Sequence, residues 1–176
     1  MNWITKFIKP KIELLFKKKT AGSDQILWTT CECKNLIYKE DLQKNFNCCP
    51  KCDSHHKLSC TERFKIFFDN KDYELIDTPL PKDDPINFVD TKKYTDRLMT
   101  ARKITKQDDA VAIATGKVEN IQVTVGAQDF RFIGGSFGAA SGEAFICGVQ
   151  HAIDNKNPFI FYSCSGGQRM MESSIA

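Results

Sequence analysis

The sequence predicts an α/β protein that begins with a four-cysteine zinc ribbon, and three observations lead to this fold class. Five of the eight cysteines cluster between residues 28 and 56, and paired thiolates at such spacing suit tetrahedral zinc. Downstream, β-branched segments alternate with helical patterns, as in an α/β fold. Two glycine pairs, Gly134-Gly135 and Gly166-Gly167, each lie where a strand gives way to a helix.

Composition limits the class of protein. Of the 176 residues, 41% are hydrophobic and 27% are charged, which suits one core of domain size and excludes a disordered or fibrous chain. No apolar run approaches the roughly 18 residues that a membrane span needs. Lysines occupy the start of the chain, where a signal peptide would have its apolar stretch. We therefore expect a cytoplasmic protein without a membrane span, whose clustered cysteines bind metal rather than form disulfides.

Residues 1–27 form a basic arm. Its six lysines all lie within the first nineteen positions, so any attraction to polyanions should be local. The apolar residues from Trp3 to Ile8 fit a short helical stripe, which Pro10 interrupts. The arm therefore either lies on an anionic surface or packs on its own protein, and we favour the second interpretation.

The segment 28–56 is the cysteine module. One pair forms a C-x-x-C knuckle, the other has a single residue between its cysteines, and fifteen residues separate the pairs, as expected of a ribbon. The predicted zinc ligands are Cys31, Cys33, Cys49 and Cys52. Substitution by Cys48, His55 or His56 stays open, as does a set of free thiols or a redox pair. Four thiolates leave no open coordination position, so the zinc would be structural and supply roughly 10–16 kcal/mol of folding free energy.

The segment 57–90 is predicted to contain a helix and a linker. Ser59 and Glu62 have the spacing of a capping box, so a helix should begin near Cys60, with the phenylalanines that follow in the core. Three prolines in the stretch 77–85 indicate an extended linker. We expect a domain boundary in that stretch.

Residues 91–176 form the second domain, which opens with a helix and a hairpin. Apolar residues recur at helical spacing from Tyr94 to Ala101, which predicts the helix. Two segments of β-branched and small residues follow, at 110–118 and 121–128. Only a Glu-Asn pair separates them, and this spacing is typical of a β-hairpin.

The glycine-rich stretch FIGGSFGAASGEAF leads into an apolar helix that an Asn-Pro pair ends. The predicted buried face of this helix consists of Phe145, Val149, Ala152 and Ile153. The run at 159–163 indicates a buried strand, and Gly166-Gly167 should open another helix near Gln168. The helical pattern is unfinished at Ala176, so we expect the chain to be a fragment.

A glycine pair before a helix has a chemical use. It lets the backbone approach a ligand closely and aims N–H groups, backed by the helix dipole, at negative charge. Such a turn suits an enolate or a phosphate equally, and it can also be mere chain geometry. Neither pair fits G-x-G-x-x-G or the P-loop pattern, so nucleotide-binding motifs of those kinds are not supported.

Four stretches taken together resemble one family. In chain order they are WTTCECKNLIYKEDLQKNFNCCPKCDSHHKLS, KKYTDRL, FIGGSFGAASGEAF and NPFIFYSCSGGQRMMES, and they are similar to the beta subunit of bacterial acetyl-CoA carboxylase carboxyltransferase. The resemblance implies a ribbon followed by the first part of a crotonase-like (ClpP/crotonase) domain of ββα units. It also implies transfer of a carboxyl group from carboxybiotin to acetyl-CoA, which forms malonyl-CoA in the first committed step of fatty acid biosynthesis.

The same resemblance implies cofactors and partners. The cofactors are one structural zinc ion and biotin, which a separate protein carries. The partners are the carboxyltransferase alpha subunit, in an alpha2beta2 heterotetramer, the biotin carboxyl carrier protein and biotin carboxylase. RNA or DNA is a further partner to consider for the ribbon.

The resemblance places the family's S-G-G-A-R-M-Q-E turn on residues 165–172, with departures at Gln168 and Met171 that spare both glycines. It implies that N–H groups near Gly166 and Gly167 hold the thioester oxygen of acetyl-CoA, so these two are the candidate catalytic residues. The candidate substrate-binding residues are Gly134, Gly135, Ser165 and Arg169. The rest of the pocket is expected after the last residue of this chain or on the partner.

Two other functions compete with this one. A nucleic-acid-binding ribbon protein is the runner-up, because a four-cysteine ribbon beside a basic arm with Trp3 and Trp28 could grip a phosphate backbone. Such a binding module does not need two strand–glycine–helix turns, whereas a CoA enzyme does. An acyl-CoA hydratase is a third interpretation, and the ribbon and the lack of a placed carboxylate pair weaken it.

Overall fold

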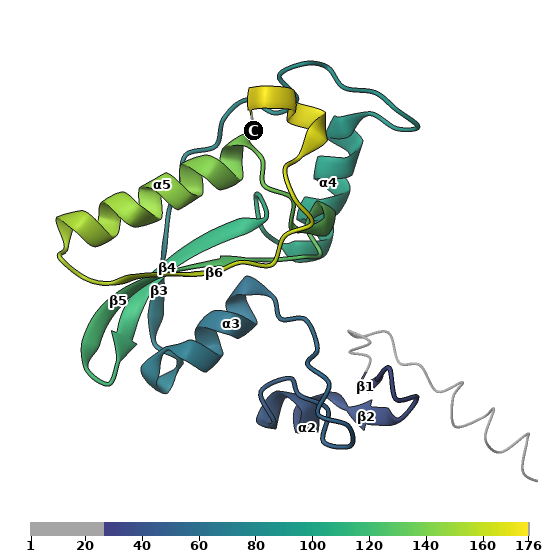
Figure 1. The fold of residues 1–176 in the computed structure, drawn as a ribbon, viewed down its shortest axis with the longest axis vertical. Helices are drawn as coiled ribbons and strands as arrows, with labels where there is room; N and C mark the ends of the chain where they lie inside the picture. The colour runs from purple at the N-terminus through teal and green to yellow at the C-terminus, as the bar shows by residue number, and fades with distance from the viewer. Residues whose placement is uncertain (1–26, 176) are drawn as a thin grey trace, which may run out of the picture. The chain divides into compact units, whose positions relative to one another are not determined.

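The computed structural model describes residues 27–175, which fall into two compact units divided between Ser54 and His55 (Figure 1). The predicted basic arm lies, apart from Leu27, outside the described residues, so its helical stripe stays a prediction. No helix within 27–175 combines the length and the apolar character that a membrane crossing requires.

The first unit is built on a short hairpin. β1 (Trp28–Thr30) pairs antiparallel with β2 (Leu36–Tyr38), and the helix α2 (Lys39–Lys44) follows directly. Ile37 and Leu42 are buried in one cluster with cysteines of both pairs. Two large aliphatic side chains make a very small core, so burial alone stabilises this unit weakly.

The second unit contains a four-stranded sheet in the order β3–β4–β5–β6 (Figure 1). Its strands are β3 (Tyr73–Ile76), β4 (Val111–Val118), β5 (Ile121–Gln128) and β6 (Phe159–Tyr162). The first three are antiparallel neighbours, whereas β6 lies parallel to β5. Parallel neighbours need a crossover connection, which the helix α5 (Ala139–Asp154) provides.

The hairpin predicted for the start of this sheet is confirmed. β4 and β5 pair residue for residue over their whole length. The two turn residues, Glu119 and Asn120, have φ values of 48° and 67°, as a type I′ turn requires. Asparagine tolerates this conformation better than most residues, so the turn helps to set the register of the strands.

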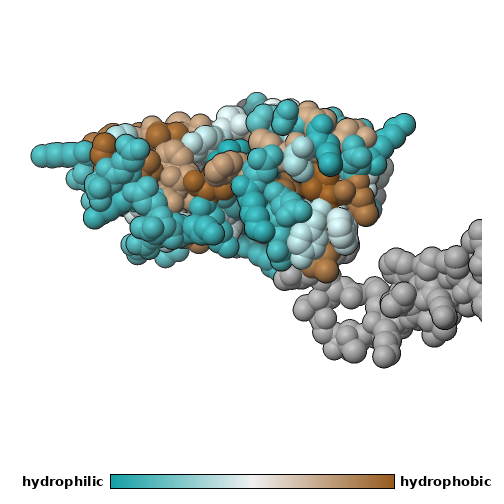
Figure 2. All heavy atoms as spheres, turned by 90° about the horizontal axis from the view of Figure 1, so that it is seen from below, coloured by the Kyte–Doolittle hydropathy of each residue, from teal (hydrophilic) through white to brown (hydrophobic). Residues whose placement is uncertain are grey.

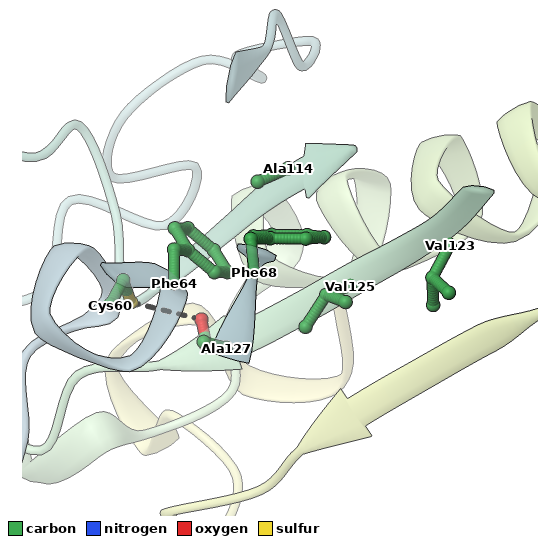
Figure 3. Close-up of a cluster of buried hydrophobic side chains, with 7 residues drawn as sticks. All are labelled: Cys60, Phe64, Phe68, Ala114, Val123, Val125 and Ala127. Carbon is green, nitrogen blue, oxygen red and sulfur yellow. Dashed lines mark hydrogen bonds between the residues drawn. The ribbon is translucent and has the colours of Figure 1, made fainter. Parts of the chain in front are cut away.

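The helix α3 (Cys60–Phe67) covers one face of the sheet. Its predicted capping box is present, because Ser59 Oγ accepts from the N–H of Glu62 at 3.2 Å and the Glu62 carboxylate accepts from the N–H of Ser59 at 2.8 Å. Figure 3 shows the buried cluster that follows, in which Phe64 and Phe68 pack with small and β-branched residues of β4 and β5. These phenylalanines are core residues, as predicted.

The helix α5 covers the opposite face with a side that matches the predicted one in part, because Ala152 is buried and Phe145 packs against Phe159 and Phe161. Its fully buried residues are small: Ser141, Ala144, Gly148 and Ala152. A Cβ on Gly148 would lie 2.9 Å from Phe159 and 3.0 Å from Ile113, so glycine allows the helix to approach β4 and β6 closely. Ile153 was predicted to be buried and is 63% exposed. Apolar residues also reach the surface elsewhere, among polar ones (Figure 2).

The helix α4 (Tyr94–Thr105) confirms the prediction from its apolar spacing, and Tyr94 is among its buried residues. Short 3₁₀ turns, η1 (Asp69–Lys71) and η2 (Ile133–Gly135), connect other elements. The end of the described chain differs from the prediction. Instead of an α-helix that opens near Gln168, it forms the 3₁₀ segment η3 (Met170–Ile175).

Residues 57–90 belong to the second unit and are not a separate segment. The helix α3 packs on the sheet, and β3, which the sequence pattern did not predict, forms its edge beside β4. The proline-rich stretch 77–85 contains no helix or strand, as expected of an extended linker, yet the division between the units lies before it, at Ser54. The strand β6 is only half-buried because it pairs with a single described neighbour, β5.

Candidate functional site

The four predicted zinc ligands lie together in the first unit. Their Sγ atoms all lie within 4.8 Å of one another, with Cys31 and Cys52 3.6 Å apart and Cys33 and Cys49 3.9 Å apart. Four sulfurs at about 2.3 Å from a tetrahedral zinc would lie roughly 3.8 Å from one another. The set therefore fits a structural zinc ion, and the short spacing between the first two cysteines does not keep either thiol out.

Hydrogen bonds from the surrounding chain support thiolates at this centre. The side-chain amide of Asn35 donates to Cys33 Sγ at 3.3 Å, and it lowers the pKa of the Cys33 thiol to about 6. The N–H of Lys51 donates to Cys49 Sγ at 3.4 Å. Donors of this kind stabilise the deprotonated form, which is the form that binds metal.

The purified chain is expected to hold about one zinc ion, and Cys49→Ser should release it, because three thiolates hold a structural zinc poorly. Cys48→Ser is the matched control, since this neighbouring thiol is outside the four-sulfur group of the described residues. Elemental analysis of freshly reduced protein measures both variants. Zinc retained in Cys49→Ser, or lost in Cys48→Ser, would show that the wrong one of these adjacent cysteines has been chosen.

The two glycine turns of the second unit meet in space, although about thirty residues separate them in sequence. The N–H of Gly166 donates to the carbonyl of Gly134 at 2.9 Å, and the N–H of Phe137 donates to the carbonyl of Gly167 at 2.9 Å. The backbone N–H of Arg169 donates to the carbonyl of Phe137 at 2.8 Å. These three bonds tie both turns into one unit, which we call the glycine clasp: residues 133–137 and 165–169.

Both segments of the clasp contain residues with positive φ values. Gly134, Gly135 and Gly167 have φ values of 67°, 64° and 123°, in the region that favours glycine. A Cβ on Gly135 would lie 2.1 Å from the carbonyl oxygen of Cys164, so no side chain fits there. Ile133 has a φ of 46°, which is an outlier for a β-branched residue. Strain of this kind gathers at functional sites and costs about 1–3 kcal/mol.

The amides of the clasp differ in their availability to a ligand. The N–H of Gly166 is used within the clasp, on Gly134. The N–H of Gly167 donates to the hydroxyl of Ser165 at 3.0 Å, and both residues are exposed. The Ser165 hydroxyl can rotate away from the N–H of Gly167, whereas the backbone carbonyl of Gly134 is fixed opposite the N–H of Gly166. Of the two candidate catalytic residues, Gly167 therefore presents the more accessible donor.

Arg169, a candidate substrate-binding residue, requires a correction because it is only 1% exposed. Its guanidinium binds Asp109 through two bonds of 2.7 and 2.8 Å and donates to the carbonyl of Ser136 at 2.7 Å. Burial opposes the charge, but the hydrogen bonds to Asp109 outweigh it and raise the pKa of Arg169. The side chain is committed to its own protein, so it positions the clasp and does not face a substrate.

Sequence reasoning missed the partners of this arginine. Tyr94 donates a short hydrogen bond to Glu172, whose other oxygen accepts from the N–H of Ala139 at 2.6 Å, at the start of α5. Burial, followed by the bond to Glu172, raises the pKa of Tyr94. Asp109 accepts from the hydroxyl of Ser141 at 2.5 Å. Asp109 lies directly before the predicted strand 110–118, and this position was the available signal, because a charged residue there either faces solvent or requires a buried partner.

Two sequence families match this chain. Residues 28–52 match the acetyl-CoA carboxylase zinc finger domain, and residues 79–175 match the carboxyl transferase domain. The first range contains the four-sulfur centre, and the second contains the whole glycine clasp.

Curated relatives match over the full length of the chain. Acetyl-coenzyme A carboxylase carboxyl transferase subunit beta of Pelagibacter ubique is 45% identical over 183 residues, which cover 100% of this chain and 58% of that protein. The protein of the same name from Granulibacter bethesdensis is 40% identical, over 100% of this chain and 57% of its own length. A crystal structure of transcarboxylase 12S has a TM-score of 0.48 and 23% identity, over 66% of this chain and 20% of that chain.

The family matches decide between the interpretations of the sequence. They confirm the predicted order of a four-cysteine ribbon followed by a carboxyltransferase domain, and the described residues form a mixed α/β fold. They do not favour a nucleic-acid-binding ribbon protein, because the second unit carries the carboxyl transferase domain. The chain spans a little under three fifths of the length of the relatives described above, 58% and 57%. It belongs to the carboxyl transferase domain family.

Proposed function

We propose that this chain is the amino-terminal part of the beta subunit of an acetyl-CoA carboxylase carboxyltransferase. The subunit would take part in moving a carboxyl group from carboxybiotin to acetyl-CoA, which yields malonyl-CoA for fatty acid biosynthesis. The relatives that bear this name support the proposal over the whole chain. The observation that carries it is the glycine clasp, which joins both glycine turns through the bond from Gly166 to Gly134 within the matched domain.

The clasp suits the stabilisation of a thioester enolate. Removal of a methyl proton from acetyl-CoA places negative charge on the thioester oxygen, and a backbone N–H held in position can bind that oxygen. We assign this role to the N–H of Gly167, once the hydroxyl of Ser165 has turned away. One such donor is worth about 2.7–4 kcal/mol in comparable oxyanion holes. Apart from its chain neighbours, no atom of the described residues lies within 4 Å of a Cβ built on Gly167, so the space beside its Cα is open.

The proposal also covers cofactors and partners. A zinc ion held by the four cysteines of the ribbon would stabilise the fold and take no part in the reaction. Biotin would arrive on its carrier protein and supply the carboxyl group. The alpha subunit, in an alpha2beta2 assembly in the cytoplasm, would complete the acyl-CoA pocket, and biotin carboxylase would reload the carrier.

Gly167→Val in the full-length beta subunit, assembled with its alpha partner, is expected to lower the turnover number at least about 10²-fold. Valine disfavours a φ of 123°, and its side chain would fill the open space beside the Gly167 Cα, which a substrate bound at the neighbouring N–H needs. The measurement is malonyl-CoA formation from a carboxybiotin donor and acetyl-CoA.

Gly142→Ala is the matched control, because a Cβ there meets only Phe137 at 3.7 Å, an ordinary contact, and it should leave turnover near the wild-type value. The 176-residue chain alone should form no malonyl-CoA. Turnover by this chain alone, or an unaffected Gly167→Val complex, would place the site elsewhere.

A further inference from the structure

A small cavity lies next to the glycine clasp, within the second unit. Its volume is about 210 Å³, and its lining comes from the ends of β5 and β6, from the segment before α3 and from α3 itself. Sites for whole nucleotides or drug-sized molecules usually occupy about 300–1,000 Å³. The cavity is therefore suited to a compact group and is too small for an entire cofactor.

The lining of this cavity is cationic. Lys57 and Arg63 both contribute to it, and none of the aspartates and glutamates within residues 27–175 does. The two carboxylates nearby in sequence have other partners: Glu62 accepts from Ser59 at 2.8 Å, and Asp129 is paired with Arg131 at 2.6 Å. Two cations that share a cavity without a lining carboxylate favour an anion inside it.

Aromatic rings position these cations without neutralising them. Lys57 Nζ lies 3.3 Å from the centroid of the Phe130 ring, and Arg63 Cζ lies 4.8 Å from the centroid of the Tyr162 ring. Cation–π contacts of this geometry hold a charged group in place but leave its N–H donors available. The donors of both side chains can therefore bind a ligand.

A third lining residue, His56, has a ring nitrogen that requires an explanation. Its Nε2 atom is buried and has no hydrogen-bond partner among the described residues. Buried polar atoms are nearly always paired, and an unpaired one often marks a bound water or ion. A water-sized molecule does not reach this atom, so His56 contributes its ring to the wall of the cavity but no donor to a ligand inside it.

The cavity and the clasp share the buried side chain of Gln128. Its amide nitrogen donates to the carbonyl of Gly135 at 2.9 Å, and its oxygen accepts from the N–H of Cys164 at 3.1 Å. Gln128 and Cys164 also line the cavity. A group inside it would therefore lie close to a thioester bound at the clasp.

We infer that this cavity binds the carboxylate of the carboxylated thioester, through Lys57 and Arg63. The inference rests on the proposed function, in which a neutral acetyl thioester becomes a malonyl thioester with a new negative charge beside the clasp. The cavity distinguishes these two species by charge, because its cationic hydrogen-bond donors can bind the carboxylate that only the malonyl thioester carries. It is a product subsite and binds malonate-like anions of small size.

Calorimetric titration of the purified chain with malonate tests the inference. Malonate is expected to bind saturably, and Lys57→Gln and Arg63→Gln should each weaken it about tenfold, as loss of one charge-assisted hydrogen bond does. Lys65→Gln is the matched control, because it removes the same charge from an exposed position of α3 outside the lining and should leave affinity unchanged. Titration of the His56 ring signal by nuclear magnetic resonance locates the ligand.

Equal malonate affinity in all four proteins, or no change in the His56 signal, would overturn the inference. Inorganic phosphate is the second probe, and tighter binding of phosphate than of malonate at this position would refute the assignment to a carboxylate. Malonate binding does not depend on turnover, so its failure leaves the carboxyltransferase proposal intact. In the assembled enzyme, Arg63→Gln should raise KM for malonyl-CoA in the reverse reaction and leave KM for acetyl-CoA unchanged.

Discussion

Replacing Arg169 with methionine is expected to lower the free energy of unfolding by about 3–5 kcal/mol. The reason is the pair of carboxylates that the change would leave behind, since Asp109 and Glu172 are both only 6% exposed and both bind this guanidinium. Leaving a buried charge without its partner destabilises a protein by far more free energy than the intact ion pair contributes to its stability. Urea denaturation of the purified chain, followed by circular dichroism, measures the loss.

The matched control is Arg102→Met, which breaks a bond pair of the same geometry at the surface. Arg102 binds Asp83 at 2.6 and 2.8 Å, but the two side chains are 30% and 43% exposed. Exposed pairs contribute only about 0.2–1 kcal/mol. If Arg169→Met destabilised the chain no more than this control does, the buried network would not hold the second unit together.

Gly135→Ala is expected to destabilise the second unit by about 2–5 kcal/mol. A left-handed conformation costs alanine roughly 1–2 kcal/mol, and forcing a methyl group into an occupied space costs about 1–3 kcal/mol more. The occupied space is that of the Cys164 carbonyl oxygen, 2.1 Å from the new Cβ. Because this contact joins the two halves of the clasp, the substitution should also separate them, and malonyl-CoA formation by the assembled enzyme should fall.

Gly134→Ala separates conformational strain from the steric clash. Its φ of 67° is nearly the same as that of Gly135, 64°, but a Cβ at Gly134 has no neighbour within 4 Å. This variant should therefore lose only the roughly 1–2 kcal/mol of the left-handed conformation. Thermal unfolding of both variants checks the difference, and equal losses would mean that the two turns are less closely joined than the clasp requires.

Local signals in the sequence predicted the local structure of this chain well. The capping box of Ser59 and Glu62 starts α3 where expected, and the Glu119-Asn120 turn closes the predicted hairpin. The four cysteines converge despite the short first spacing. Each of these features depends on residues within a few positions or on the cysteines of a single cluster, so the pattern contains most of the information.

Features that depend on tertiary packing were harder to predict. The buried side of α5 is made of small residues, because close approach to the sheet mattered more than the size of apolar side chains, and Ile153 points outward. The strand β3 has four residues of which the middle two are exposed, so it shows little pattern. The family resemblance placed Arg169 among the substrate-binding residues, and only its distant partner Asp109 reveals the structural role.

The network around Arg169 has a consequence for the order in which the chain folds. Its bonds to Asp109 and Tyr94 connect residues 60 and 75 positions apart in sequence, whereas the β4–β5 hairpin closes through a two-residue turn. Loop-closure entropy favours the hairpin as an early structure and delays the arginine contacts until after the folding transition state. Interactions that form late mainly slow unfolding. We therefore expect the buried guanidinium contacts of Arg169 to lower the unfolding rate of the second unit, and with it the rate at which the glycine clasp opens.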